Sequence, residues 1–204
     1  ADTNYPKVVN GKIVDGHGWL FRAAQQALQT GMNENQIRDH LFSAIDWSKK
    51  VTQGSLGGTT AGSLQQMRGQ AAAFGIQPTD SWYGDRIRNI TLGNDTADGA
   101  LERIKQMAKQ RYSAFSSQID SGQTVDDIAE GYKQSMSKVL EINPGQVNVF
   151  DNHIQSALTK KNDTGADAPT SIGDFEKSLR QDSRWQYTNN AKDTLLTQGQ
   201  NVLQ

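Results

Sequence analysis

The chain has 204 residues, a formal net charge of −1 and 35% hydrophobic residues. This near-neutral charge gives no general attraction to nucleic acid or to an acidic membrane surface. The chain contains no cysteine, which excludes disulfide bonds, thiolate catalysis and cysteine-based metal sites. No apolar run approaches the roughly 20 residues that span a bilayer, so we expect no membrane partner. The low apolar content predicts a shallow core or several small ones.

Residues 1–18 predict an extended arm. Pro6 disfavours a helix before it, and three glycines loosen the backbone that follows. Such an arm lies either on a neighbouring protein or free in solvent. If it docks, we expect the partner contacts to be made by Tyr5, Val8, Val9 and Ile13.

Helical patterns begin at Trp19 and fill a predicted domain over residues 19–160. A first helix ends at Gly31, and a second starts after the N-cap Asn33 with Ile37, Leu41 and Ile45 as its buried stripe. This pair resembles a DNA-binding helix-turn-helix, but a plain helical hairpin is the favoured interpretation. The second helix carries one basic residue against three acidic ones, and that charge repels phosphate.

The rest of this domain is predicted from caps and apolar stripes. Residues 49–63 are predicted to be a loop rich in Gly, Ser and Thr, followed by a helix at 63–74. The next helix restarts after Pro78 with Trp82, Ile87 and Ile90 inward. Later helices are capped by Thr96, by the Thr124/Asp127 capping box and by Asp151.

The C-terminal part is predicted to be a linker at 161–170 followed by a helical hairpin at 171–204. Ser171 caps its first helix, and Trp185 and Tyr187 are predicted to fill the corner before the second, where Leu195 and Leu196 continue the apolar stripe. The last helical pattern runs to the end of the sequence, so we expect a piece of a longer chain. The fold class is therefore all-α, an irregular array of about nine short helices with an extended N-terminal arm.

No residue pattern specifies a reaction. Asp15 and His17 lack the spacing of a metal site, and the glycine-rich run near residue 57 lacks the Lys that ends a phosphate-binding loop. Asp80 and Asp85 flank an aromatic pair, as in a glycoside hydrolase site. Asp80 also suits a helix cap, and an aromatic residue on a short helix is usually core. We therefore predict no enzyme activity, no cofactor and no metal.

Three stretches carry a resemblance: "TGMNENQIRDHLFSAIDWSKK", "DSWYGDRIRNITLGNDTADGALERIKQMAKQRY" and "FEKSLRQDSRWQYTNNAKDTLL". They are similar to segments of virion structural proteins, in the tail or inside the head, of tailed bacteriophages that infect actinobacteria. The shared pattern is a helix start after Gly, a W-x-x-x-I segment and a closing L-R-x-D-x-R-[WY]. The resemblance covers most of residues 19–204.

This resemblance implies a component of a virion that acts in particle assembly through protein–protein contacts. Its partners would be other virion proteins, or further copies of the same chain. Two alternatives stay open at this point. One is a cell-wall-degrading enzyme domain carried by the particle, which requires an acidic cleft. The other is a nucleic-acid-binding helical module, whose binding would weaken steeply with salt.

Overall fold

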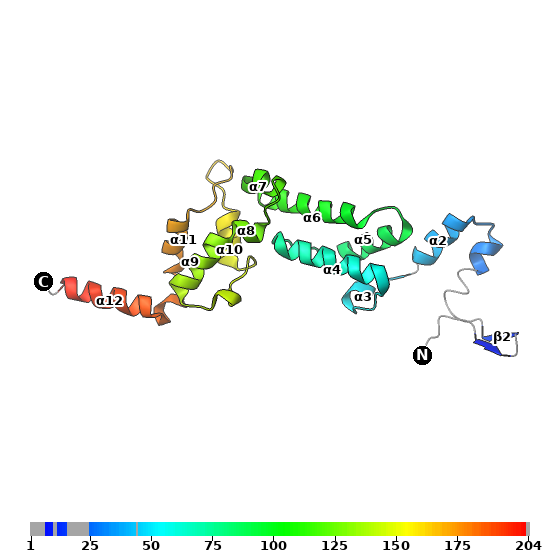
Figure 1. Ribbon diagram of the computed structural model, residues 1–204, viewed down its shortest axis with the longest axis horizontal. Helices are drawn as coiled ribbons and strands as arrows, with labels where there is room; N and C mark the ends of the chain where they lie inside the picture. The colour runs from blue at the N-terminus through cyan, green and yellow to red at the C-terminus, as the bar shows by residue number, and fades with distance from the viewer. Residues whose placement is uncertain (1–6, 10–11, 16–24, 44, 203–204) are drawn as a thin grey trace. The chain divides into compact units, whose positions relative to one another are not determined.

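The computed structural model describes residues 7–9, 12–15, 25–43 and 45–202 of the chain. Apart from one short hairpin, the regular structure in these residues is helical, which confirms the all-α class (Figure 1). The hairpin pairs β1 (Lys7–Val9) with β2 (Lys12–Asp15) in antiparallel register. The contacts divide the chain into two units, one of residues 1–67 and 78–100, the other of residues 68–77 and 101–204.

The first unit contains helical residues 25–29, α2 (Glu34–Ser43), α3 (Trp47–Thr52), α5 (Asp80–Leu92) and the first part of α4 (Gly58–Ala73). Asn33 caps α2 as predicted, because its Oδ1 accepts the N–H of Gln36 at 3.0 Å and its own N–H donates to Gln36 Oε1. The apolar stripe of α2 is only half-buried, and α2 contains no buried residue.

The predicted loop at 49–63 is wrong, because α3 runs to Thr52 and α4 begins at Gly58. Asp46 caps α3 by accepting the N–H of Lys49 at 2.9 Å, and Val51 is buried. The glycine-rich composition hid the first turn of α4, since Gly58 and Gly62 lie inside that helix. Gly54, in the turn after α3, and Gly58, the first residue of α4, both take positive φ.

The closest packing in the first unit is between α3 and α5. A Cβ atom on Gly84 of α5 would lie 2.8 Å from the backbone nitrogen of Ser48 and 2.9 Å from the carbonyl carbon of Trp47. The absence of a side chain therefore allows the two backbones to meet. Among the residues predicted to point inward on α5, Ile87 is fully buried but Trp82 is only half-buried. Its neighbour Tyr83 is buried instead.

The second unit contains the remaining helices. Several are short, and their bounds are α6 (Ala97–Arg111, of which residues 101–111 belong here), η1 (Ser113–Phe115), α7 (Ser116–Asp120), α8 (Val125–Ile128), α9 (Glu130–Leu140), η2 (Pro144–Gln146), α10 (Asn152–Leu158), α11 (Ile172–Leu179), η3 (Trp185–Tyr187) and α12 (Asn189–Val202). The predicted caps Thr96, Thr124, Asp151 and Ser171 all accept a backbone N–H of the following turn.

The core of this unit lies where α9 packs on α11. The rings of Tyr132 and Phe175 meet edge to face at 5.2 Å, and Tyr132 donates its hydroxyl to the carbonyl of Thr170 at 2.6 Å. Met136 and Leu179 are fully buried. A second anchor is Tyr112, whose hydroxyl lies 2.8 Å from the carbonyl oxygen of Gly75.

Residues 161–170, the predicted linker, belong to this unit. Lys161 and Asp167 form an isolated antiparallel bridge. The N–H of Thr170 donates to the carbonyl of Ala157 at 2.9 Å. The polar side chain of Asn162 explains the turn, because its Oδ1 accepts the N–H groups of Thr164 and Ala166.

Candidate interaction surface

The last helix, α12, is held to the rest of the second unit through its first turn. Glu141 follows α9 in the left-handed conformation, with φ of 51°, and among the described residues it is the only non-glycine with positive φ. Its Oε2 accepts the N–H of Asn189 at 2.9 Å, and its Oε1 accepts the N–H of Asn190 at 2.8 Å. One carboxylate therefore satisfies two N–H groups that the start of a helix leaves without partners.

Further contacts secure the same turn. Asn190 donates its side-chain amide to the carbonyl of Lys138 at 3.0 Å, so α12 is bound to the last turn of α9 as well. Thr188 is buried and caps α12 by accepting the N–H of Ala191 at 3.0 Å, and Ala191 is buried. The N–H donors of Asn189 and Asn190 hold the pKa of the Glu141 carboxyl below its usual range.

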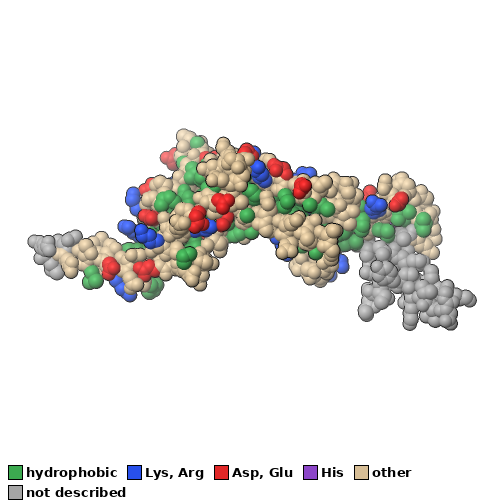
Figure 2. Space-filling view, in the orientation of Figure 1, with side chains coloured by type: hydrophobic (Ala, Val, Ile, Leu, Met, Phe, Trp, Pro, Cys, Tyr) green, Lys and Arg blue, Asp and Glu red, His purple; other side chains and the backbone are tan. Residues whose placement is uncertain are grey.

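Beyond this turn α12 exposes apolar side chains. Leu195 and Leu196 are 64% and 65% exposed, and Tyr187, just before the helix, is 77% exposed. Figure 1 shows α12 running away from α9 and α11, and Figure 2 shows hydrophobic side chains at the surface in this region. Leu195 and Leu196, predicted to continue the apolar stripe of this helix, are exposed and do not pack on the core. We call Tyr187, Leu195 and Leu196 the α12 face.

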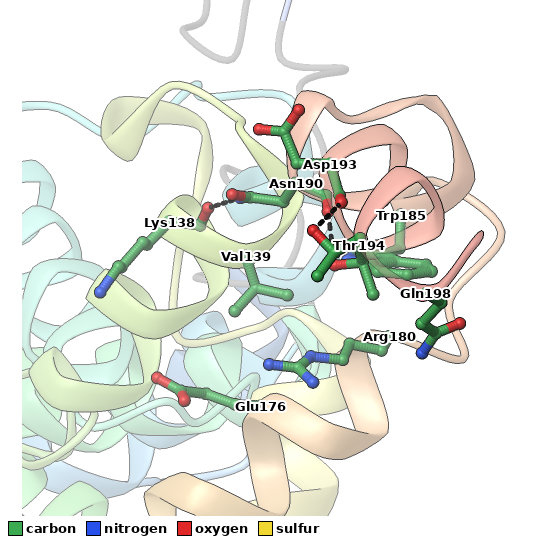
Figure 3. A pocket seen from close by; sticks show the side chains of 10 residues that line it. Lys138, Val139, Glu176, Arg180, Trp185, Asn190, Asp193, Thr194 and Gln198 are labelled. Atoms are coloured by element: carbon green, nitrogen blue, oxygen red, sulfur yellow. Dashed lines mark hydrogen bonds between the residues drawn. The ribbon is translucent and has the colours of Figure 1, made fainter. Parts of the chain in front are cut away.

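A groove of about 560 Å³ lies between α9, α11 and α12 (Figure 3). Its walls mix apolar side chains, Val139 and Trp185, with charges of both signs, Lys138 and Arg180 against Glu176 and Asp193. Glu176 accepts a hydrogen bond from Ser135 at 3.0 Å. The mixed charge favours no simple anion or cation, and the groove is suited to the polar side chains at the edge of a protein interface.

The corner before α12 contains Trp185 and Tyr187, the aromatic pair predicted to fill it. Trp185 is half-buried and lines the groove, as a residue that fills a corner should. Tyr187 is exposed, so its half of that prediction is wrong. The corner is fixed instead by a polar cluster, in which Asp182 accepts hydrogen bonds from Arg184 Nε at 2.9 Å and from Arg184 Nη2 at 2.7 Å.

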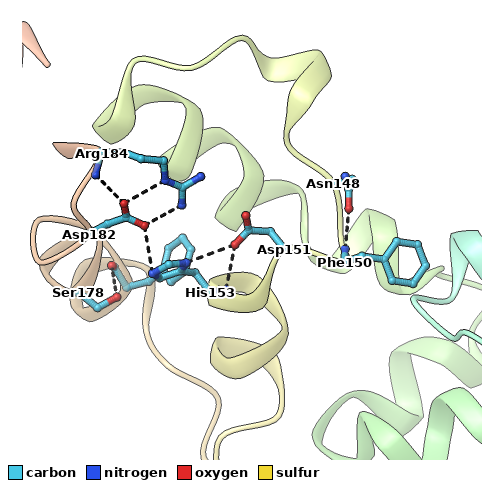
Figure 4. Close-up of polar contacts among 8 residues, drawn as sticks. Asn148, Phe150, Asp151, His153, Ser178, Asp182 and Arg184 are labelled. Carbon is cyan, nitrogen blue, oxygen red and sulfur yellow. Dashed lines mark hydrogen bonds and ion pairs between the residues drawn. The ribbon is translucent and has the colours of Figure 1, made fainter. Parts of the chain in front are cut away.

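This cluster extends to α10 through a histidine (Figure 4). The Nε2 of His153 lies 3.4 Å from Oδ2 of Asp182, and its Nδ1 lies 3.4 Å from Oδ1 of Asp151. The Asp182 side chain is 8% exposed. The guanidinium of Arg184 and its backbone N–H lower the pKa of Asp182 to about 2, so this carboxylate is ionised at neutral pH.

The four residues predicted to contact a partner belong to the N-terminal arm. Val8 and Val9 lie on β1 and Ile13 on β2, where Val8 is the register partner of Ile13. Tyr5 lies outside the described residues. Their role in binding a partner stays a prediction. The α12 face was not predicted as a surface, although the paired leucines in the middle of a polar helix were visible in the sequence.

Asp80 and Asp85, weighed as a hydrolase pair, both lie on α5. Asp80 Oδ2 accepts a hydrogen bond from the Thr52 hydroxyl at 2.9 Å, and Asp85 is exposed. Within the described ranges, no three His, Asp or Glu side chains are placed to hold a metal ion. None of the described helices is long and apolar enough to cross a membrane.

The chain was compared with known proteins at three levels. No family model, curated protein or solved structure matches it.

Proposed function

We propose that this chain is a structural component of a tailed-phage virion and acts in particle assembly by binding other proteins of the particle. The pattern in residues 19–204 supports this proposal. The observation that carries it is the α12 face, where two adjacent leucines are exposed on a helix attached by its first turn and a tyrosine is exposed just before that helix.

The energetics of α12 favour a partner. Isolated helices of fewer than about 12–15 residues are marginal in water, and most helical stability in proteins comes from packing of an apolar face. α12 has 14 residues and keeps Leu195 and Leu196 in solvent. Burying one leucine side chain contributes about 1.5–3 kcal/mol. A partner that covers both would stabilise the helix and gain affinity from the same contact.

The test is incorporation into particles. The gene carrying Leu195→Ser and Leu196→Ser would replace the wild-type gene in the phage that encodes it, and purified particles would be analysed by quantitative mass spectrometry. We expect peptides of the wild-type chain in the particles and a loss of about tenfold or more for the double variant, since two buried leucines correspond to more than 1.4 kcal/mol. Absence of the wild-type chain from purified particles would refute the proposal.

A matched control uses Leu28, which is 70% exposed in the first unit. Leu28→Ser removes a leucine of similar exposure and should leave incorporation unchanged. Equal loss for the control and the double variant would mean that general solubility, and not the α12 face, decides incorporation. Light scattering of the purified chain then tests whether the partner is a second copy of the chain, because a dimer would have about twice the monomer mass of 22.4 kDa.

A further inference from the structure

The polar cluster at the corner before α12 has the geometry of a pH-dependent contact. His153 on α10 is placed between two carboxylates that come from different segments, Asp151 at the start of its own helix and Asp182 in the corner. A neutral imidazole has one N–H donor and one bare nitrogen, whereas the protonated ring donates from both nitrogens. Only the protonated ring can therefore donate to both carboxylates.

We propose that His153 is a pH-dependent clasp, which ties the 182–184 corner to α10 when its ring is protonated and releases one of the two contacts when the ring is neutral. In the neutral ring one bare nitrogen faces a carboxylate oxygen at 3.4 Å, and two acceptors do not attract. The corner leads directly into η3 and α12, so the clasp controls how firmly the segment before α12 is held.

The other charged groups around the ring indicate that the change in contacts on protonation of His153 is local and modest. Arg184 donates hydrogen bonds to both oxygens of Asp182. These bonds remain when the contact between Asp182 and the histidine ring is lost. On the open side, His153 shares a groove with Lys160 of the α10 end and with Asp174 of α11. The cluster thus contains three carboxylates and two permanent cations, and the third positive charge is the one that protonation adds.

The clasp predicts a result that a purely structural histidine does not. Histidine ordinarily titrates near pH 6.5, between the two conditions of the test. Amide hydrogen exchange in peptides covering residues 182–190 would be compared between wild type and His153→Gln at pH 5.5 and at pH 8. Because the wild type and the variant are compared at the same pH, the dependence of the intrinsic exchange rate on pH does not affect the ratio. We expect the variant to exchange about two- to fivefold faster at pH 5.5, as for a partly exposed ion pair, and at the wild-type rate at pH 8.

Two further variants make the test specific. Asp151→Asn keeps a side-chain oxygen that can cap α10 but removes one charge facing the ring, so it should reduce the difference between pH 5.5 and pH 8. His40→Gln removes a histidine on α2, in the first unit, and should change neither rate. Equal acceleration by His153→Gln at both pH values, or none at either, would overturn the clasp.

Discussion

The close approach of the α3 and α5 backbones can be tested by adding one methyl group at Gly84. Gly84→Ala places a Cβ atom 2.8 Å from Ser48 N, 2.9 Å from Trp47 C and 3.2 Å from Ser48 Cα. All three are backbone atoms, so no side-chain rotation can relieve the contact and α3 must move. Overpacking of this kind costs about 1–3 kcal/mol, and we take the upper end because the obstacle is backbone. Alanine gains about 1 kcal/mol over glycine in a helix interior, which leaves a net destabilisation of about 2 kcal/mol.

A matched control is Gly62→Ala in α4, within the same unit, because a Cβ at Gly62 has no atom within 4 Å. This variant should gain about 1 kcal/mol from helix propensity alone. The two substitutions therefore differ by about 3 kcal/mol in the free energy of unfolding, measured by urea denaturation followed by circular dichroism. If Gly84→Ala proved as stable as Gly62→Ala, the close approach of α3 to α5 would be refuted.

Three further predictions concern the second unit. Tyr112→Phe removes the buried hydroxyl beside Gly75 O and should lower the free energy of unfolding by about 1–2 kcal/mol in urea titrations, whereas the same change at exposed Tyr187 should stay within about 0.5 kcal/mol. Glu141→Gln weakens the charge-assisted bonds to the first turn of α12, so limited proteolysis within α12 should become faster while cleavage in α4 is unchanged. Because the pKa of Asp182 is lowered to about 2, its contribution to stability is present above its ordinary pKa of about 4 and is lost as pH falls toward 2. Asp182→Asn should therefore lower the urea midpoint at pH 7 more than at pH 2, and an equal loss at both would contradict this assignment.

The helix starts were predictable because capping is a local interaction. Asn33, Thr96, Thr124 and Ser171 each accept an N–H three residues ahead, a distance over which sequence spacing fixes geometry. The start of α4 was missed where glycine and threonine dominate the composition, and the start of α3 was missed in the run just before it. A single acidic cap at Asp46 and apolar residues spaced along α4 outweigh that composition, and propensity is the weaker signal.

Contacts between distant segments could not be predicted in the same way. Gly84 is an isolated glycine inside a helical pattern, which signals a close approach without naming its partner. Glu141 joins α9 to residues almost fifty positions later, and the sequence showed only an acidic residue at a helix end. Its left-handed conformation ends α9 as a C-cap, with its own N–H bonded to the carbonyl of Ser137.

The contrast between α9 and α12 explains why the exposure of the α12 face was not predicted from the sequence. Both helices show an apolar stripe, and α9 buries Tyr132, Met136 and Leu140 because α11 packs against it. An apolar stripe therefore predicts that one face of a helix will pack against another element. Which element packs there, if any, is decided by tertiary structure. In α12 the first-turn N–H groups of Asn189 and Asn190 are accepted by Glu141 and that of Ala191 by Thr188, while Leu195 and Leu196 stay in solvent. An anchored helix whose apolar residues are uncovered presents them at a fixed place to whatever binds, which makes α12 the first segment to vary in a search for the partner.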